Sequence, residues 1–562
     1  MNAEVLLAYY DRVVDAPDAV DKLRRLILDL AVRGKLVPQD SGDEPASALI
    51  KRIDSERQRL LARGEISKQR SGPKLMEDEL PFALPPNWMW TRVRDITSDR
   101  GQAVPQQPFT YIDVTAINKK LGKIQGAAVL TPDAAPSRAR KIARGGDVLY
   151  SCVRPYLLNV AIVNNDITPP PIVSTAFAVL CGFDLVLARY QWVVLRSPLF
   201  VSLVAGKMRG QAYPAINDAD FSRLPFPLAP LAEQHRIVAK VDDLMSLCDK
   251  LEAARADREK TRDSLTAAAV VRLSEADGES FQENARFVLE SMSALTARAD
   301  QIAQLRSVIL HLAVRGKLVP QDSKDEPASE LYQESLARRA ATENSHRIRG
   351  VSLRSEATES NGPFEIPSTW RWVRLVEIAE FSAGRTPSRT DASLWNNGEH
   401  AWVSISDMVD GQILQGTKET ISKRARDTVF RREPDPPGTI IMSFKLTIGK
   451  ISRLGIYAFH NEAIVSIKPY VSALDAYLFQ VLPMFARQGN TKQAIKGATL
   501  NRHSIANILI PLPPLSEQQR IVAKVAELMD LCNKLETTLE EREKSRCRLL
   551  STLLVDALAP AA

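Results

Sequence analysis

Apolar residues recur at helical spacing in several stretches of this chain. In the first such stretch Val20, Leu23, Ile27 and Leu30 follow one another at steps of three and four. That spacing places their side chains on one face of an α-helix. The pattern therefore predicts an amphipathic helix that packs one face against other parts of the fold.

A longer apolar seam, with alternating steps of four and three residues, occurs twice. Its members are Ile237, Val241, Leu244, Cys248 and Leu251 in the first copy, and Ile521, Val525, Leu528, Cys532 and Leu535 in the second. This is the heptad pattern of coiled-coil helices. Highly charged sequence follows each seam and is typical of a solvated helical face. The pattern predicts two long helices that pair as a coiled coil, with both cysteines buried as small apolar residues.

Between these helical regions the period changes to that of short strands. The β-rich runs are VLYSCV from Val148, NVAIV from Asn159, TAFAVL from Thr175, TIIMSF from Thr439 and AIVSI from Ala463. Residues rich in Pro and Gly separate them. We expect two mixed α/β globular domains of about 140 residues each, within the usual domain size range. The polar segments 59–81 and 337–363 are expected to be flexible connectors.

The repeats identify a tandem duplication. LRRLILDLAVRGKLVPQDSGDEPAS from Leu23 matches LRSVILHLAVRGKLVPQDSKDEPAS from Leu305, 282 residues later. PLAPLAEQHRIVAKVDDLMSLCDKLE from Pro227 matches PLPPLSEQQRIVAKVAELMDLCNKLE from Pro511, 284 residues later. The sequences between the blocks are almost equal in length and hardly alike. Chance cannot produce matches of this length in the same order, so the chain contains one unit duplicated in tandem.

The expected fold class is α+β, or mixed, with an internal pseudo-twofold duplication. Two α/β domains alternate with long repeated helices. The expected organisation is a helical region and linker at 1–87, a first globular domain at 88–228, a second helical region and linker at 229–369, a second globular domain at 370–512, and a repeated helix at 513–562.

The RGKLVP turn that ends the first repeated helix has two compatible interpretations. Gly34 suits the left-handed residue that terminates a helix, and Pro38 prevents its continuation. The same turn could also dock a partner protein. The candidate partner-binding residues are Arg33, Lys35 and Leu36, with Arg315, Lys317 and Leu318 in the second copy.

Positive charge is concentrated in the two globular domains. Residues 88–228 contain 16 Lys and Arg against 9 Asp and Glu, and residues 370–512 contain 18 against 12. The rest of the chain has 40 against 46, although the whole chain carries a formal charge of +7. Basic domains on a mildly acidic framework suit attraction to the phosphates of DNA.

Base edges are read mainly by Arg, Lys, Asn and Gln side chains. The candidate DNA-binding residues of the first domain are Arg100, Gln102, Arg138, Arg140, Lys141, Arg154, Lys207, Arg209, Gln211, Tyr213 and Asn217. Those of the second domain are Arg385, Ser388, Arg389, Ser404, Lys445, Asn490, Lys492, Lys496 and Asn501. For any single one of them, a solvated surface residue is the more common interpretation, but as clusters they favour nucleic acid.

Other features exclude several classes of protein. No run of about eighteen apolar residues and no signal peptide is evident, so we expect a cytoplasmic protein without membrane contact. Five cysteines without a CxxC pair argue against a disulfide framework or zinc site, and we expect no bound metal. There is no P-loop and no glycine-rich cofactor turn.

DPPG at 435–438 lacks the aromatic residue of an adenine methyltransferase motif and is expected to be a turn.

Taken together, the arrangement resembles the specificity subunit of type I restriction–modification systems. The resemblance rests on PLAPLAEQHRIV and PLPPLSEQQRIV, the two RGKLVPQD blocks, GRTPSR followed by LWNNGEHAWVSISDM, and GDVLYSCVRPYL. It covers almost the whole chain. The first domain has DRGQAV and FTYIDV where the second has GRTPSR and WVSISDM, so its contact positions are less well defined.

The resemblance implies two target-recognition domains held apart by an antiparallel pair of helices, each domain reading one half of a split site in double-stranded DNA. Two methyltransferase subunits would dock on the repeated helices, and motor-nuclease subunits could join the complex. This chain would bind no cofactor, and S-adenosylmethionine would bind to the methyltransferase partner. Two alternatives remain: a scaffold that displays two protein-binding domains, and an autonomous DNA-modifying enzyme with an unfamiliar active site.

Overall fold

The computed structural model describes two compact units of the chain. The described residues are 16, 18–66, 75–210, 213–275, 297–345, 362–445, 447–488, 492–494 and 497–558. Unit 1 is formed by Met1–Glu259 together with Arg542–Ala562, and unit 2 by Lys260–Glu541. Each unit contains one copy of both repeated blocks and one of the divergent stretches between them, so the division follows the duplication.

In unit 1 the helix α3 (Ala19–Val32) runs antiparallel to the first part of α9 (Leu231–Glu275). Arg24 near the start of α3 forms ion pairs of 2.6 and 2.8 Å with Asp249 and Glu252 of α9. Gln39, beyond the end of α3, donates to Glu233 in the first turn of α9 at 2.5 Å. Because contacts late in α9 match residues early in α3, the two helices point in opposite directions.

The predicted apolar seam of α9 is buried against this short helix and the adjoining domain. Ile237 and Val241 are fully buried, and Cys248 is nearly so, within a cluster that also holds Ile27 of α3. Leu244 and Leu251 are partly buried against the same cluster. The seam is therefore a packing surface as predicted, and its described neighbours belong to its own unit. The pairing of α9 with the second long helix as a coiled coil stays a prediction.

The last part of the second long helix forms a small, separate hydrophobic cluster of unit 1. Leu550 and Leu553 of α18 (Leu515–Leu558) pack on Ala16 and on Ala19 at the start of α3, and all four are buried. The N-terminal end of α3 therefore depends on residues more than 500 positions further along the chain.

The first globular domain (residues 88–228) consists of short strands and helices. Their bounds are β1 (Met89–Arg92), α5 (Val93–Ile96), β2 (Phe109–Ile112), β3 (Ile117–Asn118), β4 (Lys123–Ile124), β5 (Ala128–Leu130), β6 (Ala139–Ile142), β7 (Val148–Ser151), β8 (Val160–Ile162), β9 (Pro171–Ser174), β10 (Phe177–Leu180), α6 (Ala188–Leu195), α7 (Pro198–Ala205), α8 (Asp218–Ser222) and β11 (Pro225–Leu228).

These strands form a four-stranded sheet in the order β5-β2-β9-β6, a three-stranded sheet in the order β10-β7-β8 and two short pairs, β1-β11 and β3-β4. The first and last strands of the domain pair antiparallel, with Met89 opposite Leu228. The domain therefore starts and finishes at one place, directly before α9.

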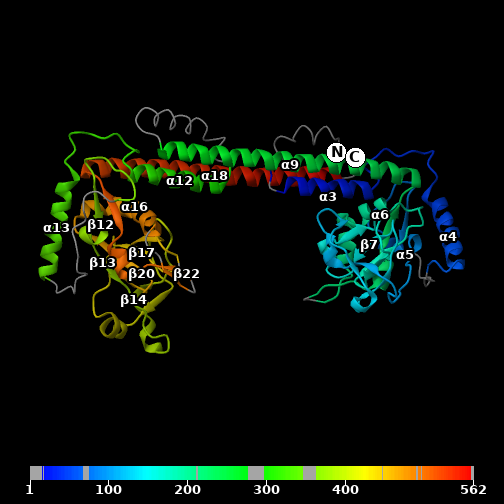
Figure 1. The fold of residues 1–562 in the computed structure, drawn as a ribbon, viewed down its shortest axis with the longest axis horizontal. Coiled ribbons are helices and arrows are strands. Elements are labelled where there is room, and N and C mark those ends of the chain that lie inside the picture. The colour runs from blue at the N-terminus through cyan, green and yellow to red at the C-terminus, as the bar shows by residue number, and fades with distance from the viewer. Residues whose placement is uncertain are drawn as a thin grey trace. The chain divides into compact units, whose positions relative to one another are not determined.

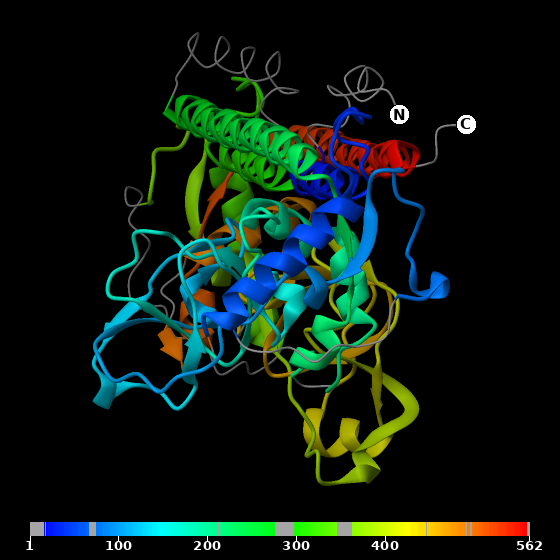
Figure 2. The ribbon, with the colours of Figure 1, turned by 90° about the vertical axis from the view of Figure 1, so that its right-hand side faces the viewer.

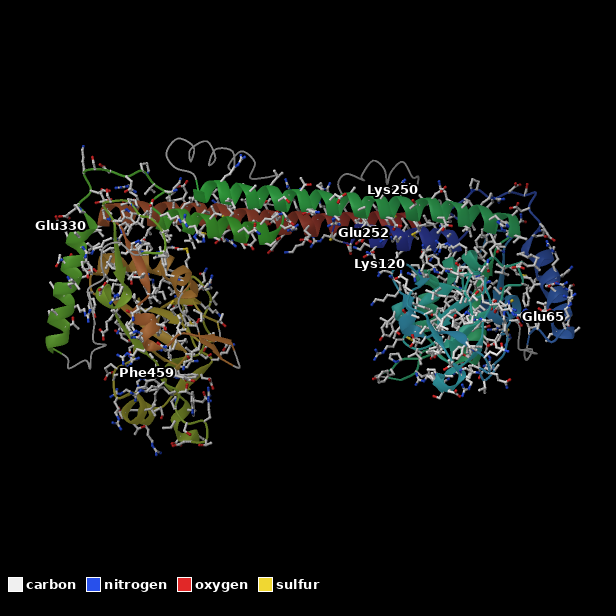
Figure 3. All side chains as sticks on the ribbon, viewed as in Figure 1. Glu65, Lys120, Lys250, Glu252, Glu330 and Phe459 are labelled. Carbon is white, nitrogen blue, oxygen red and sulfur yellow. The ribbon has the colours of Figure 1, made fainter. Side chains whose placement is uncertain are left out.

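Two helices were missed by the sequence reasoning: α4 (Ala46–Ala62) and α13 (Ala328–Ser345). Ala46, Leu49 and Ile53 of α4 are fully buried in the core of unit 1. Figures 1 and 2 show α4 lying along the side of the first domain. The predicted connectors are wrong where they overlap these helices, at residues 59–62 and 337–345. Leu60 and Leu61 of α4 pack against the unit 1 core, and Ala328 and Leu331 anchor the start of α13 in the unit 2 core. Positions 67–74 and 346–361 lie outside the described residues.

Unit 2 repeats this helical plan. The helix α12 (Ala299–Val314) runs beside α18, and Arg306 donates to Asn533 and Glu536 at 2.7 Å. Within the same unit, Asp263 near the end of α9 accepts hydrogen bonds from Arg298 at 2.7 Å and from Gln301 at 3.1 Å. The seam residues Ile521, Val525 and Cys532 are buried in the unit 2 core, with Leu528 and Leu535 partly buried against it.

The second globular domain (residues 370–512) has larger sheets. Its elements are β12 (Arg371–Arg374), α14 (Leu375–Ile378), β13 (Ala379–Ala383), β14 (Trp395–Val403), β15 (Gln412–Leu414), β16 (Glu419–Ile421), α15 (Lys423–Ala425), β17 (Ile440–Ser443), β18 (Ile451–Leu454), β19 (Ala458–His460), β20 (Ile464–Pro469), α16 (Asp475–Gln488), β21 (Lys492–Ala494), β22 (Gly497–Thr499), α17 (Arg502–Ala506) and β23 (Leu509–Leu512). The sheet orders are β13-β20-β17-β18-β15, β16-β14-β19, β12-β23 and β21-β22.

The five predicted β-rich runs are all strands: β7, β8 and β10 in the first domain, and β17 and β20 in the second. Mixed helices and sheets, with two sheet-rich domains and long helices, confirm the predicted fold class. The DPPG segment is a turn as expected: Gly438 has φ of 90° and Thr439 donates its backbone N–H to the carbonyl of Pro436 at 3.2 Å.

Candidate nucleic-acid interface

A buried joint, repeated in both units, fixes each globular domain on its long helix. In unit 1 the indole N–H of Trp88 donates to Glu233 at 2.8 Å, and Gln39 donates to the other oxygen of the same carboxylate. Arg236, one turn further along α9, pairs with Asp43 at 2.6 Å. The two blocks that are repeated in the sequence therefore meet in space, at the entry to the domain.

Unit 2 contains the same joint with the corresponding residues. Trp370 donates to Glu517 at 2.8 Å, Gln321 donates to the same carboxylate, and Arg520 pairs with Asp325 at 2.6 Å. Burial raises the pKa of Glu517, as it does the pKa of Glu233, although hydrogen bonds from the Trp and Gln partners act in the opposite direction.

The sequence reasoning did not single out the joint residues. The sequence did contain a signal for them. The pair Glu-Gln is identical in the two copies of the second repeated block, at 233–234 and 517–518, whereas exposed positions of that block differ. In the structure, Gln234 and Gln518 hold the start of each long helix by donating to the carbonyls of Ala229 and Pro513.

The RGKLVP turn is largely engaged inside its own unit. Arg33 pairs with Asp29 at 3.0 Å and its guanidinium lies 4.4 Å from the ring centroid of Phe82. Leu36 packs against the unit 1 core, and Leu318 packs against that of unit 2. Arg315 lies 4.8 Å from the ring centroid of Phe364 in the same way as Arg33 on Phe82. The helix-stop interpretation accounts for these contacts. Docking of a partner on this turn, through Lys35 and Lys317 among others, stays a prediction.

Two predicted DNA-binding residues of the first domain lie in its interior, which corrects the expectation for them. Arg100 binds both carboxylate oxygens of Asp147 at 2.6 and 2.9 Å, and the Asp147 side chain is 2% exposed. Lys141 is itself 2% exposed and its ammonium lies 2.6 Å from Asp218. Since unpaired charges are costly to bury, these cations stabilise the domain and offer no free group to DNA.

Two predicted asparagines have structural roles as well. The side-chain oxygen of Asn217 accepts from the backbone N–H of Asp220 at 2.7 Å and caps α8. Asn501 accepts from the backbone of Ser504 at 2.8 Å and caps α17. Both are the preferred type of residue for a helix N-cap.

A cluster of cationic and aromatic side chains lies beyond the end of β7 in the first domain. We call it the Tyr213 cluster: the half-buried Arg154 with the exposed Arg209 and Tyr213. Lys207 is exposed two residues beyond the end of α7. The guanidinium of Arg154 lies 4.6 Å from the ring centroid of Tyr213, whose side chain is 69% exposed. Arg209 is strongly exposed and lies 3.5 Å from Asp220. Three of the predicted residues are therefore brought together here.

The remaining predicted residues of the first domain lie along β6 and its edge. Gln102 and Arg138 are exposed, and a β-bridge joins Gln102 to Lys141. Arg140 is half-buried and donates to the carbonyl of Ala139 at 2.9 Å. Gln211 lies outside the described residues, as do Asn490 and Lys496 of the second domain; Lys492 is described only as part of β21.

In the second domain the GRTPSR loop is held by two tryptophans. Trp402 donates to the carbonyl of Arg385 at 3.0 Å, and Trp395 donates to that of Ser388 at 2.9 Å. Arg389 stacks 3.8 Å from the Trp395 centroid and also pairs with Glu419. The loop therefore presents an exposed, ordered cation beside an aromatic face, a combination suited to nucleic acid.

Two other predicted residues of this domain are less free. Ser404 donates to Asp407 at 2.7 Å and bonds the hydroxyl of Ser406. Lys445 is half-buried, with its ammonium 5.5 Å from the ring centroid of Phe444.

Within the described residues no group of three or more His, Cys, Asp or Glu side chains could hold a metal ion. All five cysteines are free thiols, and all except Cys547 are buried. None of the helices in the described part of the chain combines the length and apolar character needed to span a membrane.

Comparison with known proteins gives consistent results. Residues 367–542 match the family model for the type I restriction modification DNA specificity domain. The chain is 29% identical over 561 residues to the specificity subunit of the type I restriction enzyme EcoAI from Escherichia coli, covering 95% of this chain and 93% of that protein. It is 26% identical to the EcoEI specificity subunit of the same organism, covering 96% and 94%.

A solved chain from a study of complex assembly and conformational transition of the type I R-M system has a similar fold. It is 24% identical, with a TM-score of 0.51, and the match covers 85% of this chain and 99% of that one.

Proposed function

We propose that the chain is the DNA-reading component of a type I restriction–modification complex, because residues 367–542 match the family model for the DNA specificity domain and the chain is similar to the EcoAI specificity subunit over 95% of its length. Each globular domain reads one half of a bipartite site in double-stranded DNA. The phosphate contacts position the domains, and side chains that reach the base edges specify the sequence.

One observation carries the proposal. The joint between domain and helix is the same in both units, whereas the surfaces of the two domains differ. Trp88 with Glu233, and Trp370 with Glu517, make the same hydrogen bond at the same 2.8 Å. Beyond the joint the domains differ in sheet order and side chains, yet both are basic. A framework that is kept while the domain surfaces diverge suits two readers of different half-sites.

We further propose that the chain itself is not catalytic. Its two methyltransferase partners dock on the repeated helices and turns, and S-adenosylmethionine binds to those partners; this chain needs no cofactor. Motor-nuclease subunits complete the restriction complex. Methyl transfer by the purified chain alone, incubated with S-adenosylmethionine and DNA, would contradict this assignment.

Mapping methylated adenines across the genome, with and without the gene for this chain, tests the function. We expect a bipartite motif that is methylated in the parent strain and unmethylated in the deletion strain. Restoring the intact gene is the matched control. An unchanged methylation map would overturn the proposal.

DNA binding by the purified chain separates this function from a protein-binding scaffold. Neutralising several phosphates makes the logarithm of the affinity fall steeply and linearly with the logarithm of salt concentration. Absence of DNA binding at low salt would favour the scaffold.

A further inference from the structure

Arg154 has an unusual backbone position at the surface end of a buried strand. It follows β7, whose residues are all buried, and begins the short 3₁₀ helix Pro155–Leu157. Its φ is +47°, in the left-handed region that residues with a side chain seldom occupy. Residues held in such conformations concentrate at ligand-binding sites, where the surrounding structure maintains them.

The loop that carries Arg154 is fixed to the segment that carries Tyr213. The backbone N–H of Arg154 donates to the carbonyl of Pro214 at 2.8 Å. Arg209 and Ala215 exchange two backbone hydrogen bonds of 2.9 Å, and Ile216 donates to the carbonyl of Cys152 at 3.0 Å. Both sides of the stacked pair are therefore anchored to the buried end of β7.

Among the described residues no carboxylate is paired with the guanidinium of Arg154, which stacks on Tyr213. By contrast, Arg100 is paired with Asp147, and in the second domain Arg389 is paired with Glu419. The Nε of Arg154 is buried, so an external partner can reach only the terminal nitrogens of the guanidinium.

The chemistry of this pair selects the type of partner. A planar guanidinium fork matches the O6 and N7 acceptors of guanine in the major groove, and this is the commonest specific contact between proteins and DNA. Stacking on an aromatic ring fixes the plane of the fork before binding, so less conformational freedom is lost in the complex. A phosphate contact would require only the charge.

The second domain has no aromatic residue at the corresponding position. Four residues before the capping Asn217 stands Tyr213, whereas four residues before the corresponding capping Asn501 stands Gly497. A stacked arginine of the second domain, Arg389 on Trp395, lies in a different loop and is paired with Glu419. The two domains therefore place these stacked arginines at different positions, as determinants of different half-sites should be.

We propose that Arg154, with its guanidinium held flat by Tyr213, reads a guanine in the half-site of the first domain. This assignment rests on the proposed function of the chain. It makes Arg154 a specificity-determining residue and Tyr213 a positioning residue.

The test is selection of binding sites from a random pool of duplex DNA by the purified full-length chain. Arg154→Lys keeps the charge but removes the fork. We expect its preference for G·C at one position to fall about ten- to hundredfold, with the other half-site unchanged. Tyr213→Ala should weaken the same preference, while Tyr213→Phe, which retains the ring, should preserve it.

Arg63→Lys is the matched control, because Arg63 is an exposed arginine, 59% accessible, at the end of α4 and outside the first globular domain. Thermal melting verifies that each variant is folded, and the exposed Tyr213 supplies an independent test should Arg154→Lys fail to fold. An unchanged motif, or equal weakening on all sequences, would overturn the inference and leave the proposed function intact. A wild-type chain that selects no sequence would overturn both.

Discussion

The indole Nε1 of Trp88 lies 2.8 Å from a carboxylate oxygen of Glu233, although the two residues are 145 positions apart. Trp88 stands at the entry to the first domain and Glu233 in the first turn of the helix that leaves it. A hydrogen bond to a charged group is shorter and stronger than a neutral one, and its geometry is directional. It therefore sets the orientation of the domain on its helix.

Replacing Glu233 should loosen this joint. Glu233→Ala leaves the buried Trp88 N–H without an acceptor, and we expect the free energy of unfolding to fall by about 2–3 kcal/mol. Chemical denaturation measures the change. Glu517→Ala should give a similar loss, because its contacts are the same. A loss under about 0.5 kcal/mol, the range of ordinary surface substitutions, would show that the joint contributes little.

The same carboxyl predicts a direction of pH dependence. Burial raises the pKa of Glu233 in the folded chain. The unfolded chain therefore loses this proton first, and the contribution of the group to stability is largest at low pH and declines as pH rises through the folded pKa. Glu233→Gln should remove that decline. Between pH 4 and 7, the unfolding free energy of the wild type should fall relative to that of Glu233→Gln as pH rises; a constant difference would contradict the prediction.

The helix-ending turn should be sensitive to a single methyl group. Gly34 has φ of +65°, and an added Cβ would lie 2.5 Å from the Cγ of Pro85. Gly64 has nearly the same φ, +68°, but a Cβ there would have no atom within 4 Å. We expect Gly64→Ala to cost about 1 kcal/mol from backbone strain alone. Gly34→Ala should cost at least 1 kcal/mol more in thermal unfolding, since overpacking adds about 1–3 kcal/mol. Equal losses would show that Pro85 moves aside freely.

Acid should weaken the second domain through Asp435. This carboxylate is 1% exposed and faces Arg432, His460 and Lys468 at 3.0, 3.3 and 2.8 Å. Burial alone would raise the pKa of Asp435, but these three partners hold it well below its ordinary value. Its stabilising contribution is therefore present above the unfolded pKa of about 3.9 and is lost as pH falls below it.

Asp435→Asn tests this arrangement. The variant should be less stable at pH 7 by about 2–4 kcal/mol, because the partner cations lose a buried counter-charge. Its unfolding free energy should also depend less on pH between 5 and 2 than that of the wild type. An identical pH profile would assign the acid sensitivity to other groups.

The thiols should differ sharply in reactivity. Burial raises the pKa of Cys152 to about 12, and burial also raises the pKa of Cys181 and Cys248. Since the thiolate is the reactive form, these groups should resist alkylation at pH 8 in the folded chain. Cys547 is partly exposed and should be modified first. Peptide mass mapping after iodoacetamide treatment identifies the order, and early labelling of Cys152 would contradict it.

The helices and strands with strong periodicity could be predicted from the sequence. Val20, Leu23, Ile27 and Leu30 lie in α3, and the run from Val148 is β7. The helix α4 was missed because its exposed side is densely charged and its apolar residues are few. Those few residues are nevertheless fully buried, since the domain they contact lies next to them only in the folded chain.

The individual site residues could be predicted less well. Arg100 and Arg154 are alike in the sequence, because each arginine is followed directly by a turn-forming residue, Gly101 or Pro155. The first meets Asp147, 47 positions away, and becomes an interior ion pair. The second meets the ring of Tyr213 and remains unpaired among described residues. Such differences depend on tertiary neighbours, which residue type and local spacing do not specify.

The division of unit 1 between both ends of the chain has a consequence for synthesis on the ribosome. Unit 2 is one continuous segment, so all its residues are available before translation ends. The start of α3 must wait for Leu550 and Leu553, which are translated only after all of unit 2. Domains fold as units during synthesis, generally in order from the N-terminus. Here the start of α3 is an exception: its apolar residues stay exposed in the nascent chain until unit 2 has been made.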